Sequence, residues 1–297
     1  MKRDDQYPHL LESTADLLNL KDSDRIKKIR SRRWIPYPAA IEILNDLEDL
    51  LVYPKTHRMP NLLIIGETNN GKTMLIEHFK KKYPATDNFT GDNVNVPVLN
   101  IQAPPTPDES RLYSAILTEL FAPFRQNDRV DKKSAQVIHL LKMVDTKILI
   151  IDEIHSILAG SVTKQRAFLN ALRHLGNDLR IPIVAVGTNE AHRAIRSDPQ
   201  LANRFSPVRL PKWELDENYL RLLSSFEVMI PLKKPSNLTN NTIVQKVREM
   251  SDGLLGEIST IIVNAAVEAI RNKSECISLE TLNSLRFIPP NKRKLGS

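Results

Sequence analysis

A glycine-rich loop that ends in lysine and threonine is the clearest sign of chemistry in this chain. Residues 66 to 73 read Gly-Glu-Thr-Asn-Asn-Gly-Lys-Thr, which fits the phosphate-loop pattern G-x-x-x-x-G-K-[ST]. Glycines let backbone N–H groups curl around phosphates, Lys72 can reach the outer oxygens, and the Thr73 hydroxyl can ligate Mg²⁺. We therefore expect ATP and Mg²⁺ to bind here, through Gly66, Glu67, Thr68, Asn69, Asn70, Gly71, Lys72, Thr73 and Met74.

Two later segments supply candidate partners for this loop. Residues 147–153 form a short apolar run that ends in two acids, the form of a Walker B strand. Asp152 is the expected Mg²⁺-side residue, together with Thr73, and Glu153 is the expected general base for an attacking water. A third apolar run, 183–187, delivers Thr188 and Asn189 at its tip. These two residues either hold the lytic water or form a turn with no catalytic part.

The elements needed to position these residues follow an α/β pattern. Apolar runs alternate with helical patterns, which predicts a five-stranded parallel sheet with ligands at the carboxyl ends of its strands. From Asp216 onward only helical patterns remain, which predicts a small helical domain after the sheet. The expected strands are 61–65, 96–101, 148–152, 183–187 and 208–210, and the expected helices include 109–121, 134–144, 164–175, 216–228, 239–251, 255–272 and 279–285.

Composition narrows the class of protein. The chain has 297 residues, of which 41% are hydrophobic, enough for one full core and a smaller appended unit. No apolar stretch approaches a membrane span, the N-terminus lacks a signal-peptide core, and Cys276 is the single cysteine. These features favour a soluble cytoplasmic protein without a membrane partner. The net charge of +7 would attract polyanions without identifying one.

A strand-rich nucleotide core followed by helices resembles the AAA+ ATPases, and two further motifs narrow the resemblance. Arg-Arg-Trp-Ile-Pro-Tyr-Pro-Ala stands at 32–39, and Arg-Met-Pro-Asn stands at 58–61, directly before the first apolar run. Together with the phosphate loop and Asp-Glu-Ile-His at 152–155, they make the chain similar to the TniB family of transposition ATPases, which is related to the TnsC and MuB regulators. The resemblance runs from about Arg30 to Leu285.

The resemblance implies a function as well as a fold. It implies an ATP-dependent protein that oligomerises on double-stranded DNA without sequence preference and recruits or activates a DDE transposase, with ATP hydrolysis dismantling the assembly. A ring and a helical filament both remain open, as does the guiding partner, a TniQ-like adaptor or a CRISPR effector. The alternatives are an AAA+ protein of the helicase-loader type or another remodelling ATPase, and a signalling NTPase switch with no role on DNA.

The AAA+ comparison also implies individual roles. Asn189 corresponds to the sensor position, and Arg204 to an arginine finger offered to the next subunit, with Arg196 as the alternative. Ser259 stands where many AAA+ proteins have a second sensing arginine, which favours a slow switch over a fast motor. His155 either senses the nucleotide or DNA, or has only a structural part.

Basic residues suggest where DNA would bind. The block 25–33 either contacts phosphates or is a solvated helix face that leads into an adenine contact at Trp34 and Ile35. In DNA-binding AAA+ regulators the duplex meets loops and helix starts after the second and third strands. The corresponding candidates for DNA contact here are Arg111, Arg125, Arg129, Lys132, Lys133, Lys164 and Arg166.

The expected domain organisation has four parts. A basic helical extension covers residues 1–60, the AAA+ nucleotide-binding core covers 61–212, a helical lid covers 213–287, and a basic tail covers 288–297. The tail is expected to make no core, because it reads Pro-Pro-Asn-Lys-Arg-Lys from residue 289.

Overall fold

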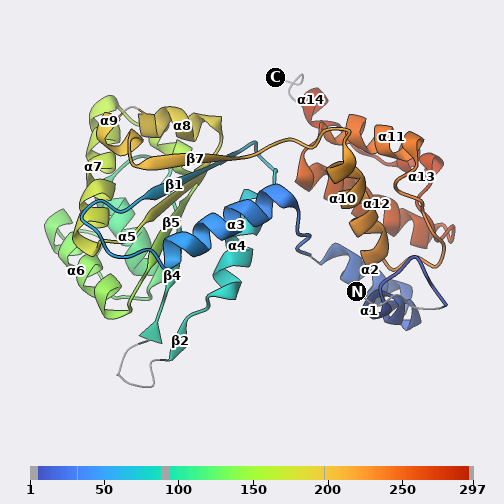
Figure 1. Ribbon diagram of the computed structural model, residues 1–297, viewed down its shortest axis with the longest axis horizontal. Coiled ribbons are helices and arrows are strands. Elements are labelled where there is room, and N and C mark those ends of the chain that lie inside the picture. Colours follow the sequence, from blue (N-terminus) through green and yellow to red (C-terminus); the bar gives the residue numbers. More distant parts are fainter. Residues whose placement is uncertain (1–5, 32, 88–93, 197, 294–297) are drawn as a thin grey trace. The chain divides into compact units, whose positions relative to one another are not determined.

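The computed structural model describes residues 6–31, 33–87, 94–196 and 198–293. Contacts within the chain define two units: Ala39–Pro211, and Met1–Pro38 together with Lys212–Ser297. The expected N-terminal extension is therefore divided, since its last part packs with the sheet and its first part with the C-terminal helices. In Figure 1 the blue helices near the N-terminus lie beside the orange and red helices of the C-terminal part.

The first unit is built on one parallel sheet, as predicted. The strand order is β4-β5-β6-β1-β7, and all four neighbouring pairs are parallel. The last strand begins before Pro207, although proline donates no backbone hydrogen bond. Among the described residues β7 pairs with β1 alone, so it is an edge strand and Pro207 can place its ring nitrogen, which has no N–H, on the unpaired side. The strands are β1 (Asn61–Gly66), β4 (Val98–Gln102), β5 (Ile148–Asp152), β6 (Ile183–Gly187) and β7 (Phe205–Leu210).

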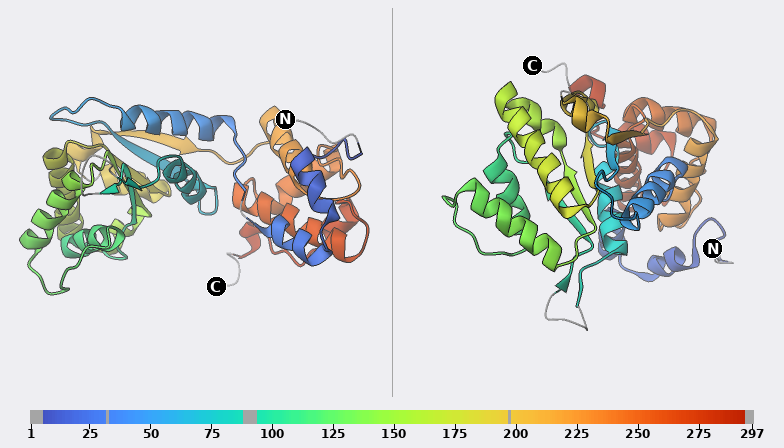
Figure 2. Two further views of the ribbon diagram at one scale, coloured as in Figure 1. Left: turned by 90° about the horizontal axis from the view of Figure 1, so that it is seen from below. Right: turned by 60° about the vertical axis from the view of Figure 1, so that its left-hand side comes forward.

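Helices cover both faces of this sheet. Figure 2 shows α3 and α4 on one side and α5, α6 and α7 on the other. Two short strands, β2 (Thr86–Asp87) and β3 (Val94–Asn95), form a separate antiparallel pair. The helices are α3 (Pro38–Leu51), α4 (Lys72–Lys82), α5 (Glu109–Glu119), α6 (Val130–Met143), the 3-10 helix η2 (Ile154–Ala159), α7 (Val162–Leu179), α8 (Asn189–Arg196) and α9 (Pro199–Ala202).

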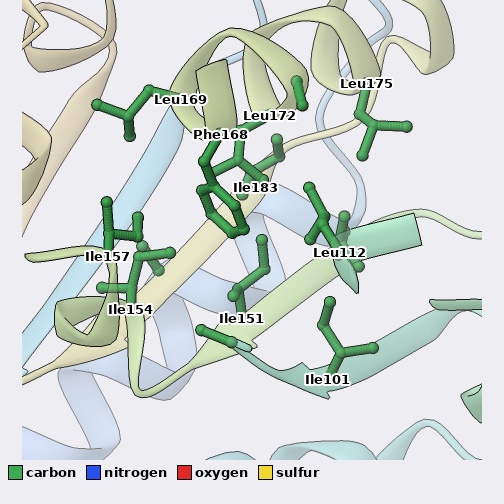
Figure 3. Close-up of a cluster of buried hydrophobic side chains, with 14 of the residues drawn as sticks. Ile101, Leu112, Ile151, Ile154, Ile157, Phe168, Leu169, Leu172, Leu175 and Ile183 are labelled. Carbon is green, nitrogen blue, oxygen red and sulfur yellow. The ribbon is translucent and has the colours of Figure 1, made fainter. Parts of the chain in front are cut away.

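The core on the α7 side follows from the alternation of the strands. Alternate strand residues such as Ile101, Ile151 and Ile183 point to the same face and are buried. Figure 3 shows them beneath Phe168 and Leu172, which project from α7 at helical spacing. Phe168 and Leu172 are fully buried. Their packing holds α7 against the sheet whose strands carry the site residues at their carboxyl ends.

The second unit is helical. Three of its long or medium helices begin at a polar side chain that accepts a backbone N–H of the first turn, namely Asp216, Asn240 and Ser278. The helices are α1 (Glu12–Ala15), η1 (Asp16–Asn19), α2 (Asp22–Arg30), α10 (Glu217–Met229), α11 (Asn241–Ser251), α12 (Leu255–Arg271), α13 (Leu279–Ser284) and α14 (Pro290–Arg293).

A buried ion pair joins the two ends of the chain within this unit. Arg25 of α2 donates to both carboxylate oxygens of Glu275, at 2.9 and 2.6 Å, and to the carbonyl of Pro231 at 2.8 Å. Arg33 donates to the carbonyl of Met229. Both cations are thus engaged in contacts within the protein, and Arg25, which is 1% exposed, is not available to DNA. Arg32 lies outside the described residues.

The basic tail includes one short helix, none of whose residues is buried. Residues 290–293 form α14, and Arg293 binds both oxygens of the buried Glu257 carboxylate at 2.7 and 2.8 Å. A buried carboxylate needs such a partner, so Arg293 of α14 compensates the charge that Glu257 of α12 would otherwise bury unpaired. Residues 294–297 lie outside the described residues. Within the described part of the chain, every helix falls short of the length and apolar character that a membrane crossing requires.

Candidate nucleotide-binding site

The phosphate loop runs from the end of β1 into α4 in a conformation suited to anions. Asn69 and Gly71 both have positive φ, 61° and 87°, which turns successive N–H groups of the loop to one side. Glu67, Thr68 and Asn69 are exposed at its lip. Asn70 is buried instead, and its side-chain amide donates to the carbonyls of Leu210 and Pro211, both at 3.0 Å. The Asn70 side chain therefore anchors the loop to β7.

The Lys72 side chain is buried within this loop. It is 5% exposed, and Nζ donates to the carbonyls of Gly66 and Glu67, both at 2.9 Å. Burial lowers the pKa of Lys72, while the charges of Glu153, Asp152 and Glu67 act in the opposite direction. Phosphate oxygens at the mouth of the loop would give this cation the anionic partner that the two carbonyls do not supply.

Thr73 and Asp152 fit the expected magnesium site. The Thr73 hydroxyl donates to Asp152 Oδ2 at 3.0 Å, across 79 residues of sequence. Two oxygens bound to Mg²⁺ at right angles lie about 2.9 Å apart, since each bond is 2.0–2.1 Å. The two oxygens are thus already at the spacing of neighbouring ligands, and a bound Mg²⁺ would supply charge compensation for the outer phosphates.

Glu153 occupies a strained position directly after β5. Its φ is 57°, an unusual value for a residue with a side chain, and its N–H donates to Asp152 Oδ1 at 2.8 Å. This left-handed turn, rather than strand alternation, sets the direction of the carboxylate. Oε2 of Glu153 lies 3.2 Å from Nδ1 of His155. Gly187 makes room for this arrangement, since a Cβ there would lie 3.3 Å from the same nitrogen.

Asn189 contacts the phosphate loop directly. Its Nδ2 donates to Oε1 of Glu67 at 3.0 Å, and its Oδ1 accepts from Arg209 at 2.7 Å. Ile65 pairs with Gly187 on one side and with Arg209 on the other, so the three strands end together at this edge. Sequence reasoning missed Arg209. Its position near the carboxyl end of the last strand was the available signal.

Arg204 lies at the amino-terminal ends of the strands, opposite to the carboxyl ends that carry the phosphate loop. It precedes β7, and its backbone carbonyl accepts from the N–H of Asn61, the first residue of β1. The strand between Asn61 and Gly66 spans about 16 Å. Arg204 therefore cannot serve the nucleotide of its own subunit, and its side chain donates to Asn177 Oδ1 at 2.8 Å.

Most of the predicted DNA-binding residues are exposed, and Lys133 is the exception. Lys133 is 2% exposed, and its Nζ donates to Ser110 and Ser114 of α5 and to the carbonyl of Gln126. The prediction that Lys133 contacts DNA is wrong, because this cation holds the first turn of α6 against that of α5. The exposed candidates are Arg111, Arg125, Arg129, Lys132, Lys164 and Arg166.

The predicted adenine contact lies in the helical unit. Trp34 is half-buried, with its ring centroid 6.5 Å from that of Tyr37, and Ile35 is buried. Tyr37 in turn packs edge-on against Trp213 at 5.0 Å. A role for Trp34 and Ile35 in binding adenine stays a prediction.

Solved structures share this fold. The ORC2 protein of Aeropyrum pernix, solved as ADPNP and ADP complexes, superposes with a TM-score of 0.60 and 16% identity over 86% of this chain and 70% of that one. The ORC1 protein of the same organism, solved in complex with DNA, gives a TM-score of 0.52 and 15% identity over 83% of this chain and 63% of that one. These likenesses show a shared α/β fold.

Sequence comparison identifies the family. The chaperone protein ClpC2 of Oryza sativa subsp. japonica, a chloroplastic protein, is 23% identical over 217 residues, which are 71% of this chain and 22% of ClpC2. The chain thus spans under a quarter of the length of that relative. The family model described as bacterial TniB protein matches residues 25–215, well over half of the chain. The chain therefore belongs to the TniB family and is built as an AAA+ ATPase.

Proposed function

We propose that this protein is an ATP-dependent regulator of transposition. In this proposal it oligomerises on target duplex DNA when ATP and Mg²⁺ are bound, recruits or activates a DDE transposase, and is dismantled by ATP hydrolysis. Membership of the TniB family supports the link to transposition. A TniQ-like adaptor or a CRISPR effector remains a candidate guide.

The observation that carries the oligomeric part is the separation of Arg204 from the phosphate loop. Lys72, Thr73, Asp152 and Glu153 gather at one edge of the sheet, while Arg204 stands at the other. A guanidinium suits the charge that accumulates on a transferring phosphoryl group. If a neighbouring copy supplies it, ATP stabilises only the assembled state, and loss of the γ-phosphate weakens the interface.

The exposed cations support a DNA surface. Lys133 brings the start of α6, which carries Arg129 and Lys132, against the start of α5, which carries Arg111. Arg129 and Lys132 pair with Asp131 and Asp128, and all but Asp128 of these side chains are largely exposed. Such surface pairs contribute only about 0–1 kcal/mol, so phosphates can displace the carboxylates. Contacts of this kind read no sequence, as a regulator that accepts many targets requires.

A second candidate function has one observation in its favour. The similarity to ClpC2, which is named a chaperone, favours a remodelling ATPase that acts on a protein partner. In that case nucleotide would drive self-association without retention of DNA.

Assembly on DNA tests the proposal. The purified full chain is mixed with random-sequence duplex and Mg²⁺ plus ATP, ATPγS, ADP or no nucleotide, and is followed by fluorescence anisotropy and electron microscopy. We expect ordered oligomers on DNA with ATP or ATPγS alone. Glu153→Gln should bind ATP and leave long-lived complexes, whereas Lys72→Ala should lose ATP binding and assembly together.

Two outcomes would refute it. A protein that stays monomeric on duplex DNA at every nucleotide concentration would exclude ATP-dependent assembly. Oligomers that form equally without DNA and never retain it would favour the remodelling alternative.

For the transposase, co-sedimentation of the cognate DDE enzyme with DNA-bound protein should require ATP or ATPγS, and equal co-sedimentation with ADP would contradict a nucleotide-gated docking step.

A further inference from the structure

Three side chains at the carboxyl ends of three adjacent strands form a hydrogen-bonded row. Arg209 of β7 donates to Oδ1 of Asn189, and Nδ2 of Asn189 donates to Oε1 of Glu67. Asn189 follows β6, and Glu67 follows β1. All three side chains are exposed, so a ligand in the phosphate loop can reach them.

The chemistry of the row fixes which way the Asn189 amide points. A guanidinium can only donate hydrogen bonds, and a carboxylate can only accept them. With Arg209 on one side and Glu67 on the other, the amide oxygen must face Arg209 and its NH₂ must face the loop. Without Arg209 the amide could turn over and present its oxygen to phosphate oxygens, which also only accept.

Glu67 is an unusual neighbour for an anion. It is an exposed carboxylate within the loop that is expected to hold a triphosphate, and its charge opposes that ligand. Its partner, the Asn189 amide, is the group that would instead donate to a terminal phosphate oxygen. Glu67 and that oxygen are both acceptors of the same donor, so one can replace the other.

We propose that Arg209 is a positioning residue for Asn189, and that Asn189 exchanges Glu67 for an oxygen of the γ-phosphate when ATP binds. Arg209 keeps the amide in the donating orientation in both states, because a guanidinium can only donate hydrogen bonds. The exchange gives the site a means to distinguish ATP from ADP, because only ATP carries the γ-phosphate. The inference rests on the proposed sensor role of Asn189 and is independent of DNA or transposase binding.

The test compares affinities for ATPγS and ADP, measured by calorimetry with Mg²⁺ and without DNA. We expect Arg209→Gln and Asn189→Ala each to weaken ATPγS by about tenfold or more, the range for one hydrogen bond to a charged group, while ADP changes little. The double variant should be no weaker than Asn189→Ala, because Arg209 acts through that amide. Arg209→Lys should recover part of the loss, and Glu67→Gln should bind ATPγS more tightly.

Steady-state ATPase kinetics and one control variant complete the experiment. Arg209→Gln should lower kcat as well as raise KM, since a misdirected amide no longer orients the attacking water and no longer binds the γ-phosphate. Arg221→Gln is the matched control, because Arg221 forms an exposed pair with Glu217 in the helical unit and should change neither affinity. Additive losses in the double variant, or equal weakening of ATPγS and ADP, would overturn the proposal. A wild-type protein that never assembles on DNA would refute the proposed function and leave this comparison intact.

Discussion

The Thr73 hydroxyl meets the Asp152 carboxylate at 3.0 Å, although the two residues come from different strand ends and are 79 positions apart. The contact arises because β1 and β5 end at the same edge of a sheet in which only β6 separates them. It prepares two oxygens for a hard cation before any ligand arrives.

Thr73→Ala and Asp152→Asn should each weaken the binding of the Mg²⁺ on which ATP hydrolysis depends. We expect the Mg²⁺ concentration for half-maximal turnover to rise roughly 10- to 100-fold, the usual effect of disturbing a metal's ligands or their partners. A Mg²⁺ titration of ATPase activity measures this. Thr68→Ala, an exposed threonine of the same loop, is the control. Equal Mg²⁺ curves for Thr73→Ala and wild type would remove the hydroxyl from the metal site.

Arg204 should act in a neighbouring subunit. Arg204→Ala and Glu153→Gln should each abolish turnover, and mixing the two should restore it, because an interface can then combine an intact Glu153 with an intact Arg204. In an equal mixture about a quarter of head-to-tail interfaces have this composition. Steady-state ATPase assays of the mixtures on DNA give the answer. No recovery at any mixing ratio would argue against a finger supplied in trans.

Charge reversal on the proposed DNA surface should weaken binding at all sequences alike. Arg129→Glu with Lys132→Glu removes two phosphate contacts, so the slope of log affinity against log salt should fall by roughly 2. Salt series on two unrelated duplexes would show it. Lys81→Glu with Lys82→Glu makes the same change of charge at the far end of α4 and serves as the control. An unchanged affinity would exclude this surface.

Lys133 should matter for folding rather than for DNA. Lys133→Met removes three hydrogen bonds that tie α6 to α5 and to the intervening loop, leaving their oxygens to find other partners. We expect about 1–3 kcal/mol less free energy of unfolding in urea titrations. The salt dependence of DNA binding should stay as in wild type where the variant is folded. A fall of about one in the slope of log affinity against log salt, with an unchanged free energy of unfolding, would instead indicate that Lys133 contacts DNA.

The Arg25–Glu275 pair should give the helical unit a dependence on acid pH. Burial alone would raise the pKa of Glu275, but hydrogen bonds from Arg25 and from the N–H of Lys233 bring it below its usual 4.5. The stabilisation is thus complete above pH 4.5 and is lost as the pH falls through the lower, folded value. Arg25→Leu should lower the free energy of unfolding by about 3–5 kcal/mol at pH 7, and less at pH 3.

Chemical denaturation followed by circular dichroism at several pH values tests this. Lys27→Leu, which removes an exposed pair with Asp24, is the control and should change stability by less than about 1 kcal/mol. A loss on Arg25→Leu that does not vary with pH would show that the pair's charges contribute little.

Gly187→Ala should disturb the site through packing. A Cβ at Gly187 would lie 2.8 Å from that of Ala191 and 3.3 Å from His155 Nδ1. Shifting these neighbours costs about 1–3 kcal/mol, and the His155 shift should lower turnover. Gly176→Ala in α7 is the control, since its new Cβ would meet Ile183 at an ordinary 3.4 Å. It should stabilise by up to about 1 kcal/mol, as helical alanine exceeds glycine. Thermal unfolding and ATPase assays distinguish the two.

Local residue patterns were enough to predict the sheet, the phosphate loop and the family. Strands of consecutive buried apolar residues are recognisable locally, and the spacing of Gly66, Gly71, Lys72 and Thr73 is set by the shape of a phosphate group. The motifs around Trp34 and Met59 sufficed for the TniB family, which the family model confirms.

Which charged residues are exposed and which are buried became known from the three-dimensional fold. Lys133 and Arg25 carry the same positive charge as Arg129, yet burial among oxygens of other helices and loops gives them structural roles. Arg209 lies in the site because β7 pairs with β1. Arg204 lies outside it, because it precedes β7 while Arg209 is near the end of that strand. These outcomes depend on strand order and register, which arise from contacts between distant segments and do not follow from local residue patterns alone.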